Sequence, residues 1–265
     1  MLHAKHASDS GYQSVVIKTP DSDVIILACY FQCMITAQII ILTGTKLRSR
    51  YIDIQKVCGQ YDDLVLKALP GLHAFTGCDT VSSFSGKGKR KAFDIIKCND
   101  ILCNQMANLG TEYQPNETYE DFVCALYGYA NYHDVNELRY HLFCSKNVQS
   151  NKLPPCKDSL QKHVQRACYQ AYIWKKALDS KPNIPSPDGN GWAMIQGELT
   201  IDWFDLLPAP AALLEFLTCS CKTKCQTGRC TCFSNRLSCT QLCKCGEDCT
   251  NHSENADSDT SDDDM

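Results

Sequence analysis

The sequence lacks an apolar run at its beginning, since residues 1–14, MLHAKHASDSGYQS, are mostly polar or small. A secretory signal peptide needs such a run, so we expect a protein that is not secreted and whose 19 cysteines stay reduced. Ten of these cysteines stand singly among apolar residues, including Cys29, Cys33, Cys58, Cys124 and Cys168. They are interpreted as small buried hydrophobic side chains and not as a disulfide framework.

Charge is lacking over residues 24–45, VIILACYFQCMITAQIIILTGT, a stretch about as long as a bilayer-spanning helix. Gln32, Thr36 and Gln38 lie near its middle, and no basic cluster marks either flank as it does beside a membrane span. We therefore predict a buried helix followed by a buried strand, with no membrane as partner.

Basic residues are missing from residues 253–265, SENADSDTSDDDM, which contain six acidic side chains. Such a segment cannot bury enough apolar surface to fold, so it is predicted to be a disordered acidic tail.

Strand-like and helix-like segments alternate over the first third of the chain. This alternation is typical of an α/β fold in which helices surround a largely parallel sheet. Pro70 lies inside one helix-like segment, and we expect it to kink or break that helix. The predicted helices cover residues 1–10, 24–32 and 62–77, and the predicted strands cover 14–18, 37–44 and 50–54.

From about residue 85 onward the pattern is helical. Asp134 with Glu137, and Asp158 with Gln161, have the spacing of capping boxes at helix starts. After the second box, apolar residues at helical spacing predict a packing face formed by Leu160, Val164, Ala167, Ala171, Trp174 and Leu178.

Proline and glycine gather in residues 180–191, SKPNIPSPDGNG, as they do in linkers. We divide the chain into an α/β domain (1–110), a helical region (111–180), a linker and connecting segment (181–217), a cysteine-rich module (218–252) and the acidic tail (253–265).

Two acids, Asp21 and Asp23, flank one residue just after the predicted strand 14–18. The carboxyl ends of strands are where α/β sheets place ligands, and a D-x-D pair offers oxygen ligands to a divalent cation. Aspartate is also an ordinary turn and cap residue, so both interpretations stay open.

A loop rich in glycine and lysine follows Asp79 in FTGCDTVSSFSGKGKRKAFDII (75–96). It is not a Walker A phosphate loop, which would need glycine at Val81 and serine or threonine at Gly88. It suits a helix-hairpin-helix, in which glycines let backbone N–H groups approach a phosphate. A solvated basic loop is the alternative. The candidate nucleic-acid contacts are Gly86, Lys87, Gly88, Lys89 and Arg90, with Lys91 adding charge.

These motifs, TPDSDVIIL and LHAFTGCDTVSSFSGKGKRKAF, resemble the flap-endonuclease branch of the PIN-like nucleases over residues 1–100. In that family two divalent metals activate water for phosphodiester hydrolysis. The resemblance implies a partial PIN-like fold and Mg²⁺ or Mn²⁺ at the acidic site. It matches Asp21 and Asp23 to the D-x-D pair, Asp79 to the acid of the G-C-D motif, and Gly86, Gly88, Lys89 and Ala92 to the hairpin.

The family carries further acids upstream of this strand, and they are absent here; Asp9 does not fit their place. We therefore expect a truncated or degenerate, transposon-derived nuclease-like domain. With an incomplete set of metal ligands, this chain alone is expected to be inactive as a nuclease.

The segment CSCKTKCQTGRCTCFSNRLSCTQLCKCGEDC (219–249) contains nine cysteines, with the C-x-C pair recurring three times. Three Zn²⁺ ions need twelve tetrahedral ligand positions, which nine thiolates supply if three of them bridge two metals. An odd number does not suit a disulfide knot. The predicted zinc ligands are Cys219, Cys221, Cys225, Cys230, Cys232, Cys239, Cys243, Cys245 and Cys249.

This spacing resembles that of the tesmin-type CXC domain, with one-residue changes in two spacers and Phe233 retained. The resemblance implies DNA binding, typically in the minor groove. A tyrosine of the tesmin type is replaced by Arg229, as in chromatin-associated CXC segments. Arginine suits a narrow minor groove, although Arg229 as a plain surface charge is equally open. With zinc bound the module is nearly neutral, so DNA affinity should be modest.

Three functions follow from the sequence. The first is a nuclear, zinc-binding, DNA-binding protein in which the CXC module is carried by a degenerate nuclease-like scaffold. The second is an active metal-dependent, structure-specific nuclease. The third is a structural zinc module for protein contacts. We expect the protein to be nuclear or, otherwise, cytoplasmic.

Overall fold

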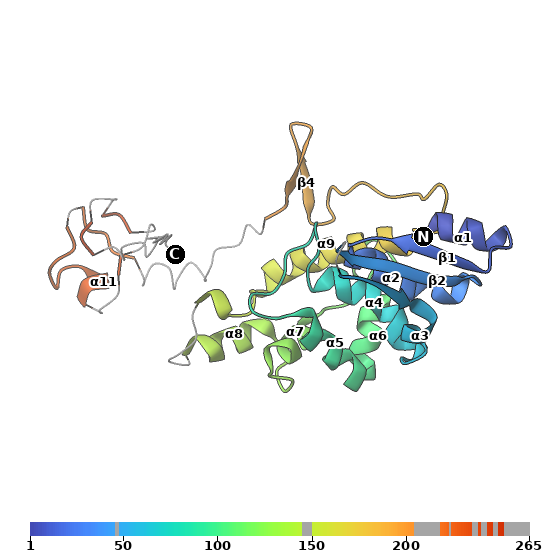
Figure 1. Cartoon of the computed structure of the whole chain (residues 1–265). Helices are drawn as coiled ribbons and strands as arrows, with labels where there is room; N and C mark the ends of the chain where they lie inside the picture. Colours follow the sequence, from blue (N-terminus) through green and yellow to red (C-terminus); the bar gives the residue numbers. More distant parts are fainter. Residues whose placement is uncertain are drawn as a thin grey trace, which may run out of the picture. The chain divides into compact units, whose positions relative to one another are not determined.

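The computed structural model describes residues 1–45, 48–144, 150–203, 218–222, 224–234, 238–239, 243–245 and 249–251. The chain forms two compact units, Met1–Phe204 and Asp205–Met265 (Figure 1). The division between them falls inside the predicted connecting segment 181–217. The predicted acidic tail 253–265 lies outside the described residues.

The first unit contains a three-stranded sheet in the order β1 (Ser14–Lys18), β2 (Gln38–Thr45) and β3 (Arg48–Asp53). β1 pairs with β2 in parallel, whereas β2 and β3 are antiparallel. The prediction of a largely parallel sheet is therefore wrong, and the sheet is mixed. The physical reason is the connection: only two residues separate β2 from β3, and parallel neighbours need a crossover of about a dozen residues or more.

Helix α2 (Ser22–Phe31) and the 3₁₀ turn η1 (Gln32–Met34) form the crossover from β1 to β2. Together with α1 (Leu2–Asp9) and α3 (Ile54–Cys58) they enclose one hydrophobic core, in which Ile39 and Ile41 of β2 are fully buried. The predicted helix and strand in the uncharged stretch 24–45 are thus confirmed, but each is only partly buried. Three residues of α2 are buried, and β2 is exposed at its end. Within the described part of the chain, no helix is both long and apolar enough to cross a membrane.

Helix α4 (Asp63–Phe75) contributes to both large cores of the first unit: Leu69 packs into the sheet core, and Leu72 and Phe75 pack into the helical core. The helix continues through Pro70 without a break. Gly71 lies so close to α6 (Asp100–Asn108) that an added Cβ would be 2.1 Å from the Met106 carbonyl oxygen.

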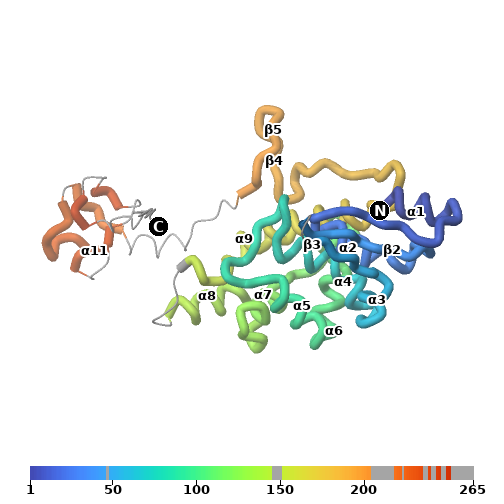
Figure 2. Tube along the Cα trace, in the orientation of Figure 1, coloured from blue at the N-terminus to red at the C-terminus, as the bar shows by residue number. Residues whose placement is uncertain are grey.

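The helical core is formed by residues of α4 and of the helices that follow it in the chain. Figure 2 shows the backbone of these helices. The Asp134 carboxylate caps α8 (Val135–Cys144) by accepting hydrogen bonds from the N–H groups of Asn136 (2.7 Å) and Glu137 (2.9 Å). These helices are α5 (Lys89–Cys98), α6 (Asp100–Asn108), α7 (Glu120–Tyr127), α8 (Val135–Cys144) and α9 (Lys157–Lys175), with a 3₁₀ turn η2 (Ser150–Lys152) before α9.

The second capping prediction is wrong, because α9 begins at Lys157 with Cys156 as its cap residue, which leaves Asp158 inside the first turn. The packing face of this helix is confirmed. Leu160, Val164, Ala167 and Ala171 are buried, and Trp174 and Leu178 are partly buried against the two cores.

Two further features of the first unit differ from the sequence interpretation. The description of the ten scattered cysteines as buried hydrophobic side chains is confirmed for half of them, Cys29, Cys58, Cys103, Cys124 and Cys168. It fails for the exposed Cys33, Cys98 and Cys144 and for Cys78 and Cys156, which are only partly buried. A β-hairpin, β4 (Trp192–Ile195) with β5 (Glu198–Ile201), lies where the sequence predicted only a connection. Its two-residue turn has positive φ at Gln196 (53°) and Gly197 (86°), the pattern of a type I′ turn.

Candidate metal centre

The nine predicted zinc ligands all lie among the described residues and form one cluster. Eight of them are buried, with 1–8% of their surface exposed, and Cys221 packs against them at intermediate exposure. In the described part of the second unit, this buried hydrophobic cluster consists of cysteine side chains alone. None of the nine is in a disulfide. Among the described residues of this unit, a buried cluster made of thiols offers little apolar surface for folding, as is typical of small metal-organised modules.

The distances between sulfur atoms fit tetrahedral zinc. A Zn–S bond of about 2.3 Å in a tetrahedron places its thiolate sulfurs about 3.8 Å apart. The Sγ of Cys219 is 3.6 Å from that of Cys225 and 3.9 Å from that of Cys239. The Cys230–Cys239 distance is 3.9 Å, and the Sγ atoms of Cys232 and Cys243 are 3.7 Å apart.

Three groups of four cysteines have all their Sγ atoms within 4.8 Å of one another. Cys225, Cys230 and Cys239 each belong to two groups and Cys219 belongs to all three, so the groups define one connected cluster and not separate sites. The groups are Cys219, Cys230, Cys232 and Cys239; Cys219, Cys225, Cys239 and Cys245; and Cys219, Cys221, Cys225 and Cys230.

Backbone contacts bring distant cysteines together. The Lys244 N–H donates to the Cys219 carbonyl at 3.0 Å, and the Cys239 N–H donates to the Asn251 carbonyl at 2.6 Å. The short helix α11 (Thr231–Ser234) follows Cys230 and carries Cys232 into the cluster.

Donors also reach the sulfurs directly, as they do around metal-bound thiolates. The Asn251 side-chain amide donates to Cys239 Sγ at 3.2 Å, and the Phe233 N–H donates to Cys230 Sγ at 3.5 Å. The Phe233 bond lowers the pKa of the Cys230 thiol to about 7.

Four basic residues of the described module are exposed. Arg229 is exposed directly beside Cys230, and Lys222, Lys224 and Lys244 are exposed as well. The remaining charged residues of the module, Arg236, Glu247 and Asp248, lie outside the described residues.

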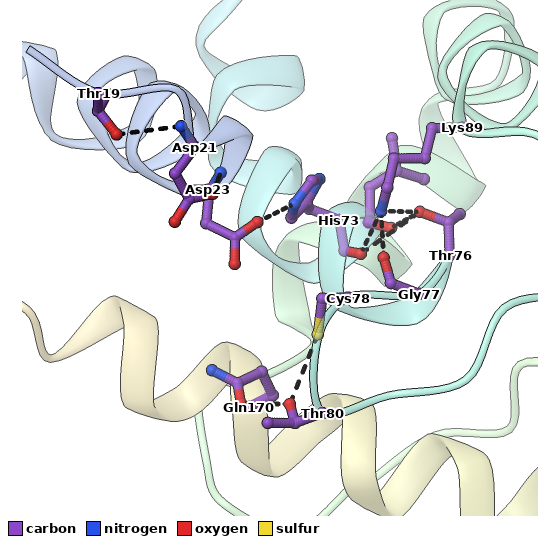
Figure 3. A network of polar contacts seen from close by, with 11 residues as sticks. Thr19, Asp21, Asp23, His73, Thr76, Gly77, Cys78, Thr80, Lys89 and Gln170 are labelled. Atoms are coloured by element: carbon purple, nitrogen blue, oxygen red, sulfur yellow. Dashed lines mark hydrogen bonds and ion pairs between the residues drawn. The ribbon is translucent and has the colours of Figure 1, made fainter.

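The acidic motif lies at the carboxyl end of β1, as predicted, but both acids already have protein partners (Figure 3). The Asp21 carboxylate caps α2 by accepting a hydrogen bond from the N–H of Asp23 at 2.8 Å. The N–H of Asp21 in turn donates a hydrogen bond to the Thr19 hydroxyl. The Asp23 carboxylate lies 2.7 Å from Nε2 of His73 in α4.

Asp79 lies in an exposed turn between Cys78 and Val81, which form an isolated antiparallel bridge. Among the described residues, the clusters of three or more ligand atoms close enough to share a metal ion consist of cysteines. Asp21, Asp23 and Asp79 do not form such a cluster, and their role as divalent-metal ligands stays a prediction.

The basic loop contains one lysine with a clear structural role. Lys89 Nζ donates to the carbonyls of His73 and Gly77 and to the Thr76 hydroxyl, so its three protons are directed at the end of α4 (Figure 3). Partial burial lowers its pKa.

The other loop residues are more open. Lys87 lies over the Tyr127 ring at 4.4 Å, while Arg90 is exposed in the first turn of α5. Gly86 has a φ of 67°, which favours glycine, and an added Cβ at Gly86 or Gly88 would meet no atom within 4 Å.

His73 is the polar residue that sequence reasoning missed. It is 6% exposed, and burial lowers its pKa against the opposing effect of Asp23. A histidine on the otherwise apolar face of the predicted helix 62–77 was the available signal. His73 also lines a cavity of about 360 Å³ with Lys89 and Arg90, whose other walls are mostly apolar side chains of α2, α3, α4 and α5.

Comparisons of this chain with protein-family models, with curated proteins and with solved structures each returned no match.

Proposed function

We propose that residues 218–252 form a three-zinc thiolate cluster that binds DNA, carried by the α/β unit as a nuclease-like scaffold without activity in this chain. The observation that supports it most is the set of Sγ–Sγ distances of 3.6–3.9 Å within an all-cysteine interior. Cys225, Cys230 and Cys239 each belong to two of the groups of four, as thiolates that bridge two metals would, and Cys219 belongs to all three. A nuclear location follows from this proposed activity.

The DNA contact is proposed at Arg229. Its exposed guanidinium stands beside the cluster, where a folded metal core would hold the backbone of Arg229 in place. An arginine so fixed suits the negative potential of a narrow minor groove. Lys222, Lys224 and Lys244 would add phosphate contacts that carry no sequence information.

Metal content is the first test. The purified chain should contain three zinc ions by elemental analysis, and Cys225→Ser should lose zinc, whereas Cys33→Ser, an exposed cysteine of the first unit, should not. A chain that folds its second unit without metal would overturn the zinc cluster.

DNA binding is the second test, measured by fluorescence anisotropy on short AT-rich and GC-rich duplexes over a range of salt concentrations. Arg229→Ala should weaken binding several-fold and reduce the preference for a narrow groove, while Arg48→Ala, an exposed arginine of the first unit, should not. Zinc-loaded protein without DNA affinity at low salt would favour the alternative of a structural module for protein contacts.

The absence of nuclease activity is a separate proposal. Its support is that Asp21 acts as a helix cap and Asp23 pairs with His73. Branched DNA should remain intact with Mg²⁺ or Mn²⁺. Cleavage that disappears in Asp21→Ala would instead establish the active nuclease.

A further inference from the structure

Strand β1 lies at one edge of the three-stranded sheet, and its outer side has no strand partner in the described part of the chain. The Gln38 N–H donates to the Gln13 carbonyl, and the Thr19 N–H donates to the Leu42 carbonyl. The N–H and C=O groups of one residue in a strand point to the same side, so odd-numbered residues of β1 face β2. The backbone groups of Ser14, Val16 and Lys18 therefore point outward.

The two edges of the sheet differ in their protection. The edge strand β3 carries Arg48 and Arg50, and charged side chains of this kind discourage pairing with another strand. β1 has the sequence SVVIK, with one charge, no proline and no bulge. Val16 at its centre is 55% exposed, a high value for the middle of an apolar strand.

The outward groups of β1 are self-complementary. If two copies pair antiparallel about a two-fold axis at Val16, each Val16 exchanges two hydrogen bonds with the other Val16. Ser14 of each copy then lies opposite Lys18 of the other, so all outward backbone groups are paired and no like charges face each other. No other register of this strand with itself pairs all three outward residues.

We propose that β1 mediates two-fold association with a second copy of this chain, joining the two sheets into one continuous sheet. The contact uses one short strand from each copy, so the dimer is weak and depends on protein concentration. The proposal stands on the first unit alone and does not depend on zinc or DNA binding. It would place two cysteine-rich modules in one assembly.

Sedimentation velocity over a range of concentrations, with a reducing agent present to exclude intermolecular disulfides, measures the association. Ser14→Glu and Ser14→Lys form a matched pair, because both change the same exposed side chain opposite Lys18. Cross-strand pairs of this kind are modest, and each occurs twice in the dimer. We expect Ser14→Glu to lower the dimer dissociation constant by roughly five-fold and Ser14→Lys to raise it by a similar factor.

Substitutions at Val16 provide a second test of the dimer. Val16→Lys should abolish the dimer by placing two lysines on the axis, while Val16→Thr, which keeps the branched β-carbon, should retain it. Circular dichroism confirms that each variant is folded. A dimer that survives in both lysine variants, or a wild-type chain that is monomeric at every concentration, would overturn the proposal. Slow amide exchange at Val16 in such a monomer would indicate that the chain itself covers this edge.

Discussion

His163 in α9 makes two hydrogen bonds that fix its tautomer. Its Nε2 lies 2.8 Å from the Phe75 carbonyl oxygen, which can only accept, so Nε2 carries the proton. Nδ1 is then the acceptor for the Ser82 hydroxyl at 3.2 Å. Burial of this side chain lowers its pKa to about 4, because the interior disfavours the charged imidazolium.

The pKa of His163 predicts a pH dependence of stability. The unfolded chain binds a proton near pH 6.5, whereas the folded chain resists it until about pH 4. The free energy of unfolding should therefore fall by about 3 kcal/mol as the pH drops from 7 to 4. His163→Gln should remove this contribution and leave the one from His73, whose pKa burial also lowers, while His3→Gln, an exposed control, should leave both intact.

Tryptophan fluorescence during urea unfolding measures the free energy of unfolding of the first unit alone, because all three tryptophans lie there. They are Trp174, Trp192 and Trp203. An unchanged pH profile in His163→Gln would show that other groups cause the acid sensitivity.

The hydrogen bonds of Lys89 lead to a second prediction about the stability of the first unit. Lys89→Met should lower the free energy of unfolding by about 2 kcal/mol, because it leaves the carbonyls of His73 and Gly77 without their charged donor. The neighbouring Arg90→Met is the matched control and should cost much less, since the bonds to the end of α4 come from Lys89. Equal effects of the two substitutions in urea unfolding would contradict this role.

At the scale of elements, α4 organises the first unit. It connects the sheet core with the helical core, and nine of its residues are buried. The contact between α4 and α6 depends on Gly71, where the absence of a side chain lets the Met106 carbonyl approach.

Gly71→Ala should therefore destabilise the first unit by about 2–3 kcal/mol, although alanine favours helix formation over glycine. The methyl group would clash with backbone atoms of α6, which cannot move aside as a flexible side chain would. Gly88→Ala meets open space and should change the thermal midpoint little. If Gly71→Ala left the stability of the first unit unchanged, α4 and α6 would be able to move apart at a low cost in free energy.

At the scale of the whole molecule, the two units differ in what holds them. The first has two hydrophobic cores, while the described interior of the second consists of cysteines. Removal of zinc by a chelator should abolish the amide protection of residues 218–251 in hydrogen exchange and leave tryptophan fluorescence unchanged. Zinc should restore the protection. Simultaneous unfolding of both units would contradict their independence.

Local patterns predicted much of the fold. The strand 14–18 and the helix around residues 62–77 were predictable because apolar periodicity and caps act over neighbouring residues. The sheet was predicted as largely parallel and is mixed, because pairing direction depends on connection length and long-range packing. The β4–β5 hairpin was missed since Gln196–Gly197 is a less common turn pair than Asn-Gly.

The sequence by itself determined the cysteine cluster, because nine thiols with recurring C-x-C pairs define the ligand chemistry before any fold is known. Only the tertiary structure decided the surroundings of the acidic motif. Asp23 and His73 are fifty positions apart, and their contact depends on how α2 packs against α4. The open edge of β1 was likewise decided by tertiary structure, because a free edge depends on which strands are neighbours in space and leaves no local pattern in the sequence.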